Sequence, residues 1–162
     1  MQISYKLARI EDFVSFFKIK CDPSNVKWSG FSLPPNKESL YKWYITNITN
    51  PHRKIFLVWL DAEIVGFFYL DIISETLCEA ASSGVLTEYT NKGIGTKTIQ
   101  WREQIAYQLG AEMIQTWVSE NNIASYRRLE KLDWVKTNEF IIKDILLSGG
   151  GNKFYKWVKR LR

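Results

Sequence analysis

The sequence contains few of the residues on which histidine-based and metal-based sites depend. His52 is the only histidine and lies in the turn-like stretch 50–53, so histidine triads and metal sites with several histidines are excluded. Cys21 and Cys78 are the only cysteines, and they lie far apart without a C-x-x-C partner, which excludes a zinc ribbon and a disulfide framework. We therefore expect no metal, and any general base must be a carboxylate, a tyrosine or a water.

Long apolar segments are missing as well. No apolar run approaches the roughly 20 residues of a membrane span. The first residues, Met-Gln-Ile-Ser-Tyr-Lys, lack the apolar segment of a signal peptide. The chain of 162 residues is long enough for one domain and short for two. We expect a single domain over 1–162, a cytoplasmic location and no membrane partner.

The charge is basic, with a net value of +5 and a pI of about 9.1. A basic cluster lies near the C-terminus and comprises Lys153, Lys156, Lys159, Arg160 and Arg162. Basic residues beside abundant aromatics are typical of proteins that bind single-stranded nucleic acid. An aromatic core with lysines at the surface explains the same composition. We expect no nucleic acid, and a basic nucleic-acid-binding module remains the alternative.

Hydrophobic patterning predicts strands interspersed with helices. The expected strands are 3–7, 54–60, 64–73, 78–86, 112–119, 140–147 and 153–161. The expected helices are 11–19, 36–48, 96–109 and 124–132, with an irregular segment at 21–35. Residues 61–63 form a tight turn between two strands, and Asn122 is suited to cap the last helix.

Two glycines, Gly93 and Gly95, lie where the strand 78–86 gives way to the helix 96–109. Free backbone N–H groups and the positive end of the helix dipole form an anion site there, and glycine lets a phosphate approach the backbone. The dinucleotide fingerprint needs a third glycine at Thr98, and Walker A needs Gly-Lys at 98–99. Neither pattern fits, and a diphosphate is the expected ligand.

Residues 85–95, Val-Leu-Thr-Glu-Tyr-Thr-Asn-Lys-Gly-Ile-Gly, resemble the pyrophosphate loop of the GNAT acetyltransferase superfamily. That loop is written [Q/R]-x-x-G-x-[G/A] and follows a strand ending V-x-P-E-Y. Thr90 stands at the usual Gln or Arg position, and Thr87 stands at the usual Pro position.

A second block, residues 122–134, resembles the pattern N-x-x-S-x-R-x-L-E-K-x-G-F of the ribosomal-protein and N-terminal acetyltransferase subgroup. The matching residues are Asn122, Ser125, Arg127, Leu129, Glu130 and Lys131. Asp133 and Trp134 replace the usual Gly-Phe. Two blocks at the family spacing are much harder to obtain by chance than one.

The resemblance implies an α/β (α+β) GNAT-like single domain with a central twisted mixed sheet of about 6–7 strands, splayed between the fourth and fifth and flanked by about 4 helices. It also implies acetyl-CoA in the cleft, with the diphosphate on the amides of 91–96 and the pantetheine along 85–87. The implied cofactor-binding residues are Val85, Leu86, Thr87, Thr90, Asn91, Lys92, Gly93, Ile94, Gly95, Thr96, Asn122, Ser125 and Arg128. Lys92 and Arg128 either neutralise phosphates or are solvated surface cations.

Catalysis needs a base for the incoming amine and a proton for the departing thiolate. Glu79 resembles a glutamate that the family often places at this strand, although its register fits only if the strand bulges. Many members protonate the thiolate with a tyrosine, but Leu129 stands at that position. Ser125 is the expected replacement and Tyr126 its competitor, and Ser125 alternatively only binds the cofactor.

The expected function is acetyl-CoA-dependent transfer of an acetyl group to a primary amine. The protein is basic and therefore fits polycationic acceptors poorly, which favours an amino sugar, a sugar nucleotide or a peptide N-terminus. The resemblance also leaves open a domain that binds CoA without catalysis. We expect a monomer or a homodimer.

Overall fold

The computed structural model describes residues 2–29, 33–143 and 153–162, which form one seven-stranded mixed sheet with helices on both faces. The strands are β1 (Ile3–Leu7), β2 (Arg53–Leu60), β3 (Glu63–Ile72), β4 (Leu77–Val85), β5 (Met113–Ser119), β6 (Val135–Ile142) and β7 (Lys153–Arg160). The helices are α1 (Phe13–Lys20), α2 (Pro23–Ser29), α3 (Lys37–Asn47), α4 (Ile94–Gln108) and α5 (Ile123–Lys131), with 3₁₀ turns η1 (Ile10–Asp12) and η2 (Thr87–Tyr89). The predicted fold class is confirmed.

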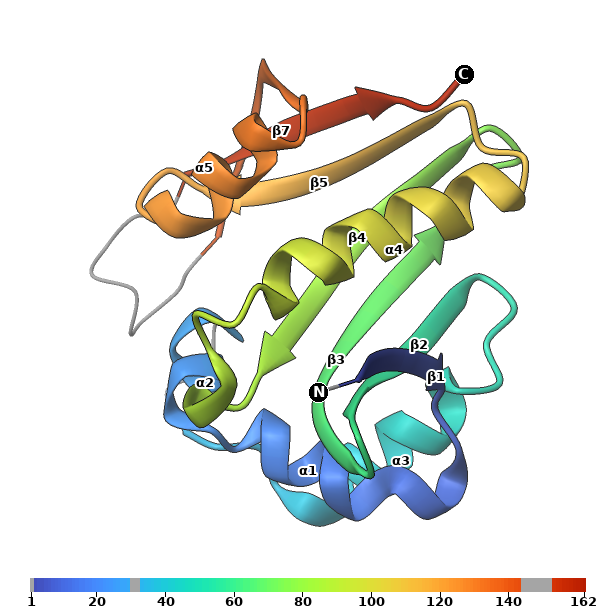
Figure 1. Cartoon of the computed structure of the whole chain (residues 1–162), viewed down its shortest axis with the longest axis vertical. Helices are drawn as coiled ribbons and strands as arrows, with labels where there is room; N and C mark the ends of the chain where they lie inside the picture. Colours follow the sequence, from blue (N-terminus) through green and yellow to red (C-terminus); the bar gives the residue numbers. More distant parts are fainter. Residues whose placement is uncertain (1, 30–32, 144–152) are drawn as a thin grey trace.

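The strand order is β1-β2-β3-β4-β5-β7-β6, and β4 with β5 is the one parallel pair in it. These two strands pair only where residues 77–79 face residues 113–115. Beyond this point β4 and β5 diverge, as Figure 1 shows between the lower half of the sheet and the half that carries α5. The predicted splay between the fourth and fifth strands is therefore confirmed.

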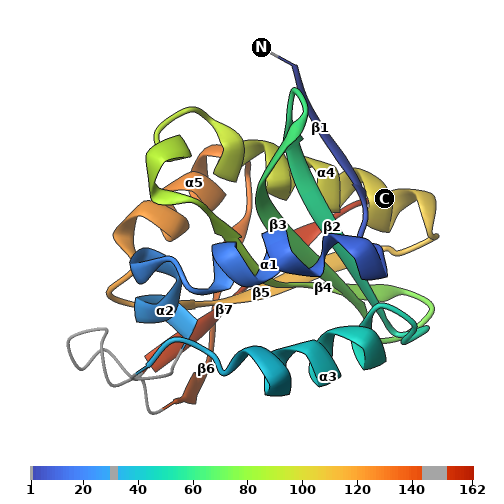
Figure 2. The ribbon, with the colours of Figure 1, turned by 90° about the horizontal axis from the view of Figure 1, so that it is seen from below.

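Helix α4 covers one face of the sheet and helices α1 and α3 cover the other (Figure 2), and each face carries its own hydrophobic core. The α4 face buries Phe56, Val58, Phe68, Leu70, Ile94, Ile99, Ile105, Ala106 and Ile114 among others. The α1 and α3 face buries Phe13, Phe16, Ile19, Tyr44, Ile55, Leu57, Phe67 and Tyr69. Because side chains alternate along a strand, successive residues of β2 and β3 serve opposite cores. Strand positions therefore determine which side of the sheet each polar residue reaches.

The structure corrects the expected secondary structure in three places. The segment 21–35 was expected to be irregular, yet it contains α2, which begins at Pro23, because proline suits the first turn of a helix. Helix α4 starts at Ile94, two residues before the expected 96. Strand β6 starts at Val135 rather than at 140, and positions 144–147 of that prediction lie outside the described residues.

Strand β6 begins early because pairing, not apolar content, defines it. Residues Val135 and Lys136 pair with Val158 and Trp157 of β7, while most of β6 is exposed. An exposed edge strand gives little hydrophobic signal in the sequence.

Among the described helices, none is long and apolar enough to cross a membrane.

Candidate active site

The divergence of β4 and β5 opens a cleft of about 1570 Å³. Pockets for one drug-sized ligand measure roughly 300–1,000 Å³, so this cleft has room for two molecules. Its loop end is lined by Thr90, Asn91, Gly93, Ile94, Gly95, Thr96, Asn122, Ser125 and Arg128. Its strand end is lined by Lys20, Trp43, Arg53, Tyr69, Asp71, Glu79 and Trp117.

The loop end is organised by the N-terminus of α4. Gly93 is the N-cap and has a φ of 79°, a left-handed conformation that glycine adopts without strain. The first amides of an α-helix have no partner within the helix, and the helix dipole makes this end positive. Because α4 has 15 residues, its start is a well-formed anion site.

A second positive group, the guanidinium of Arg128, lies against Gly95. A Cβ added at Gly95 would come within 2.7 Å of Arg128 Cζ, so only glycine lets the cation lie directly on this turn. Burial lowers the pKa of Arg128, and no carboxylate among the described residues forms an ion pair with it. A partly buried cation without a counter-ion is suited to bind a phosphate.

Helix α5 positions the second sequence block at the same end. The side chain of Asn122 caps this helix by accepting a hydrogen bond from Ser125 N at 3.3 Å. Ser125 lines the cleft, whereas Tyr126 stacks on Trp157 with ring centroids 6.2 Å apart and lines a separate, smaller cavity. Neighbouring residues of a helix point about 100° apart, which explains why only one of these two hydroxyls reaches the cleft.

Of the four expected cofactor residues at 85–87 and 92, only Val85 lines the cleft. Val85 lines the cleft, and its carbonyl accepts a hydrogen bond from Asn25 Nδ2 at 3.3 Å. Leu86 is buried, and its N–H donates to Val65 O. The amide and hydroxyl of Thr87 both donate to the carboxylate of Asp22, at 3.0 and 2.6 Å. Leu86, Thr87 and the exposed Lys92 do not line the cleft.

A β-bulge interrupts β4 inside the cleft. Phe68 faces Ser83 and Leu70 faces Ala80, so residues 81–82 of β4 lie opposite the single residue Tyr69. Such a bulge bends its strand and changes the direction of the side chains that follow. The bulge on which the Glu79 alignment depended is thus present at the point where β4 leaves β5.

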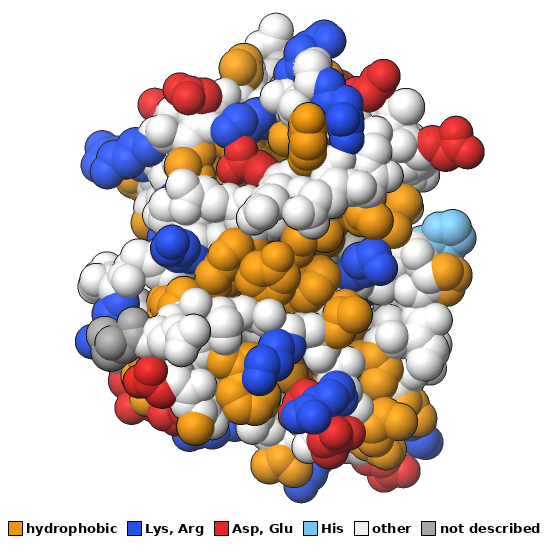
Figure 3. All heavy atoms as spheres, turned by 45° about the vertical axis from the view of Figure 1, so that its right-hand side comes forward, with side chains coloured by type: hydrophobic (Ala, Val, Ile, Leu, Met, Phe, Trp, Pro, Cys, Tyr) orange, Lys and Arg blue, Asp and Glu red, His pale blue; other side chains and the backbone are white. Residues whose placement is uncertain are grey.

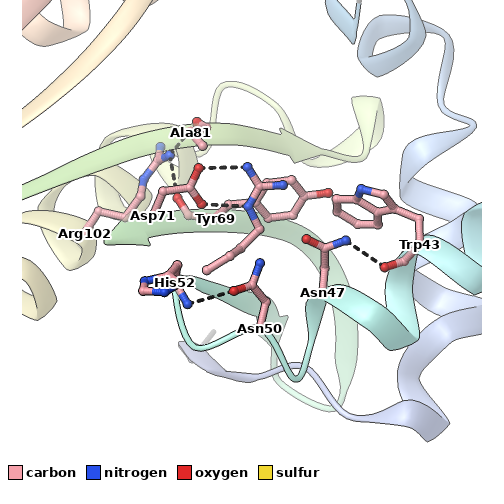
Figure 4. A network of polar contacts seen from close by, with 9 residues as sticks. Trp43, Asn47, Asn50, His52, Tyr69, Asp71, Ala81 and Arg102 are labelled. Atoms are coloured by element: carbon pink, nitrogen blue, oxygen red, sulfur yellow. Dashed lines mark hydrogen bonds and ion pairs between the residues drawn. The ribbon is translucent and has the colours of Figure 1, made fainter. Parts of the chain in front are cut away.

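The side chain of Arg102, on α4, holds this bulge (Figure 4). Its Nη1 donates to Ala81 O at 3.0 Å and to Tyr69 O at 3.4 Å, and its Nε donates to Thr98 O at 3.3 Å. Arg102 is only 4% exposed, and burial together with the nearby charge of Arg128 lowers the pKa of Arg102 to about 10. The guanidinium therefore links helix α4 to strands β3 and β4 beside the cleft.

The strand end carries a row of polar side chains across four neighbouring strands. Arg53 faces Asp71, Asp71 faces Glu79, and Glu79 faces Gln115. Arg53 binds Asp71 through two hydrogen bonds of 2.7 and 2.8 Å, which raise the pKa of Arg53. The ion pair of Arg53 with Asp71 therefore lies beside a second carboxylate, that of Glu79.

The further carboxylate, Glu79, is hydrogen-bonded through only one of its two oxygens among the described residues. Its Oε1 accepts hydrogen bonds from Gln115 Nε2 at 2.8 Å and from Trp117 Nε1 at 3.1 Å. No described donor bonds its Oε2. Glu79 is half-buried and lines the cleft, so Oε2 is the atom that can accept a proton or a hydrogen bond there.

The sequence model of the acetyltransferase (GNAT) family matches residues 16–134. The chain belongs to this family. The match runs from α1 to Trp134 and so covers both ends of the cleft. It does not separate the subgroups, and membership of the ribosomal-protein and N-terminal acetyltransferase subgroup stays a prediction. No curated protein has a matching sequence.

Solved structures with the same fold include GNAT enzymes crystallised with coenzyme A. The Vibrio cholerae spermidine N-acetyltransferase in complex with CoA and spermine has a TM-score of 0.85 at 13% identity, over 99% of this chain and 96% of that one. A Sinorhizobium meliloti phosphinothricin acetyltransferase with acetyl-CoA has a TM-score of 0.80 at 15% identity, over 99% and 89%. The Thermoplasma acidophilum PaiA N-acetyltransferase with coenzyme A has 0.70 at 20%, over 99% and 99%.

Sequence reasoning did not identify Arg102, Lys20 or the Arg53–Asp71 pair as site residues. One signal for Arg102 was available, because this charged residue interrupts the inward face of α4 between Ile99 and Ile105. Arg53 and Asp71 are 18 positions apart, and only the strand register brings them together.

We expect Arg102→Met to destabilise the protein by about 1–3 kcal/mol, because the carbonyls of Ala81 and Tyr69 lose a buried donor. Arg102→Lys should recover only part of this loss, since an ammonium cannot span both carbonyls as a guanidinium does. Urea denaturation measures the free energy of unfolding, with the exposed Gln100→Met on the same helix as control. Wild-type stability in Arg102→Met would show that the bulge does not depend on this side chain.

Proposed function

We propose that the protein is an acetyl-CoA-dependent N-acetyltransferase that acts on the primary amine of a small molecule or a peptide N-terminus. The observation that carries this proposal is one continuous cleft with an anion site at its loop end and an available carboxylate oxygen, Glu79 Oε2, at its strand end. Acetyl-CoA supplies the acetyl group as an activated thioester.

The residues of the loop end fit the diphosphate of the cofactor. The amides at the start of α4 and the guanidinium of Arg128 present positive charge on both sides of Gly95, where any Cβ would intrude. Of the three solved structures named above, two hold CoA and one holds acetyl-CoA, which supports this choice. The predicted roles of Thr90, Asn91, Ile94, Thr96 and Asn122 are kept, because all of them line the cleft.

Glu79 is proposed as the base. An amine is largely protonated at neutral pH and must lose a proton before it can attack. The hydrogen bonds from Gln115 and Trp117 hold Oε1 and orient the carboxylate, so that Oε2 is left to take this proton directly or through a water. The neighbouring Asp71 is committed to Arg53 and is a poorer candidate.

Ser125 is proposed to give a proton to the departing thiolate. It lies on the cleft-facing side of α5, whereas Tyr126 stacks on Trp157 outside this cleft, and the buried Leu129 occupies the position of the tyrosine that many family members use. The geometry favours Ser125 over Tyr126 for this role. A cofactor ligand without a proton-transfer role is the second possibility for Ser125, and the kinetics below distinguish the two.

The acceptor is proposed to bind at the strand end. Its lining brings together two cations, Lys20 and Arg53, and two carboxylates, Asp71 and Glu79. A polyamine would need a net negative field, which this set does not supply. Neutral or anionic amines, such as amino sugars, sugar nucleotides and peptide N-termini, fit better.

The nucleic-acid alternative is not favoured by the placement of the basic residues. Lys156 and Lys159 form ion pairs with Glu139 and Glu103, and Arg162 donates to the carbonyls of Ala111 and Tyr107. On the face in Figure 3, basic side chains are interspersed with acidic and apolar ones and form no continuous stripe. A domain that binds CoA without catalysis remains the second candidate, and Leu129 at the usual tyrosine position is the observation in its favour.

Gly95→Asp should remove most of the affinity for acetyl-CoA. The new carboxylate would pair with Arg128 and add negative charge where the diphosphate binds. A ligand at a hundred times its Kd stabilises a protein by about 2.7 kcal/mol, so acetyl-CoA should raise the Tm of the wild type clearly and that of the variant little. Gln100→Asp makes the same charge change on the exposed side of α4 and should keep the full shift. Equal shifts in all three proteins would exclude the loop end as the cofactor site.

Glu79→Gln and Ser125→Ala should each lower kcat by about 10²-fold or more, the usual magnitude for a general acid or base. Affinity for acetyl-CoA should change little in both. Thiol release in an acceptor screen, followed by steady-state kinetics with the best amine, measures these effects.

Glu88→Gln, at an exposed position, and Tyr126→Phe, in the separate smaller cavity, serve as controls and should retain wild-type kcat. A rise in KM for acetyl-CoA with unchanged kcat in Ser125→Ala would make Ser125 a cofactor ligand. Loss of activity in Tyr126→Phe would transfer the proton-donating role to Tyr126. A Glu79→Gln variant with full activity would exclude Glu79 as the base.

A further inference from the structure

Lys20, the last residue of α1, is a half-buried cation without an acidic partner among the described residues. It lines the strand end of the cleft, and burial lowers its pKa. Its Nζ lies 5.3 Å from the centre of the Phe67 ring, and no carboxylate among the described residues forms an ion pair with it. Partial removal from water without a counter-ion is unfavourable for an ammonium, and a bound anionic group would offset this cost.

The carboxylate next to Lys20 in the sequence and those further along the cleft are engaged by other residues. Asp22, two residues along the chain, accepts both hydrogen bonds of Thr87. Asp71 is bound by both nitrogens of the Arg53 fork, and Glu79 is held by Gln115 and Trp117. Lys20 is therefore a cation of the cleft lining that has no acidic partner among the described residues, and an anionic ligand can pair with it.

The spacing along β3 relates Lys20 to the proposed base. Lys20 lies over Phe67, while Glu79 faces Asp71, four residues further along the same face of β3. A strand rises by roughly 3.3 Å per residue, so these two positions of β3 are about 13 Å apart. A molecule that reaches both has its amine and its anionic group separated by several bonds.

Tyr69 lies midway between these positions on the same face of β3. It is 3% exposed, its hydroxyl has no hydrogen-bond partner among the described residues, and its ring packs against Trp43 (Figure 4). A buried hydroxyl without a partner costs free energy. Tyr69 thus places a buried polar group without a described partner between the two positions.

We propose that the acceptor carries a carboxylate or phosphate several bonds from its amine, and that Lys20 binds this anionic group while Glu79 receives the amine. This inference rests on the proposed acetyl transfer and narrows its substrate class. Amino sugar phosphates, sugar nucleotides and short peptides with a free C-terminus have this chemistry, whereas polyamines lack it.

Two matched substrate pairs test the inference. One pair is the dipeptide Ser-Ala and its C-terminal amide, and the other is glucosamine 6-phosphate and glucosamine. We expect the wild type to prefer the anionic member of at least one pair by tenfold or more in kcat/KM, chiefly through KM. The pair that shows the preference identifies the anion as carboxylate or phosphate. Lys20→Met should bring this ratio close to one, and Lys20→Arg should keep most of it.

Lys18→Met, an exposed lysine of the same helix, is the control and should retain the wild-type preference. Calorimetric binding of the anionic members without acetyl-CoA provides a readout that does not require turnover. Tighter binding to the wild type than to Lys20→Met by tenfold or more supports the inference even if acetyl transfer fails. Equal binding in both proteins, or equal kcat/KM within both pairs, overturns it while leaving acetyl transfer to other amines intact.

Discussion

The separation of β4 from β5 after only three paired positions is the feature on which the site depends. If the two strands stayed paired, their edges would satisfy one another and the cleft would close. The bulge at residues 81–82 bends β4 at the point of separation, and Arg102 binds the carbonyl of Ala81 there. A buried cation that bridges helix α4 and two strands thus stabilises an open sheet.

The same separation brings two different chemical environments into one cleft. At the loop end, backbone amides and Arg128 provide positive charge without an acidic partner among the described residues. At the strand end, the sheet register brings Arg53, Asp71 and Glu79 into one row, in which a single carboxylate remains available. The proposed transfer requires this separation, with a diphosphate in the first environment and an amine in the second.

Features encoded by neighbouring residues could be predicted from the sequence. Gly93 and Gly95 indicated the strand-to-helix turn, and Asn122 indicated the start of α5, because left-handed backbone and capping depend on local chemistry. Features that depend on tertiary pairing could not. Strand β6 is defined by its pairing with β7, and the inward direction of Arg102 and the contact of Arg53 with Asp71 appear only once the helix and the strands are packed.

A crystal structure of the protein with acetyl-CoA is the most direct test of this account. It should show the diphosphate on the amides at the start of α4 beside Arg128, the pantetheine between β4 and β5, and the acetyl group on the side of the cleft that faces Glu79. Coenzyme A bound outside this cleft, or β4 and β5 paired along their full length with no space between them, would contradict the account.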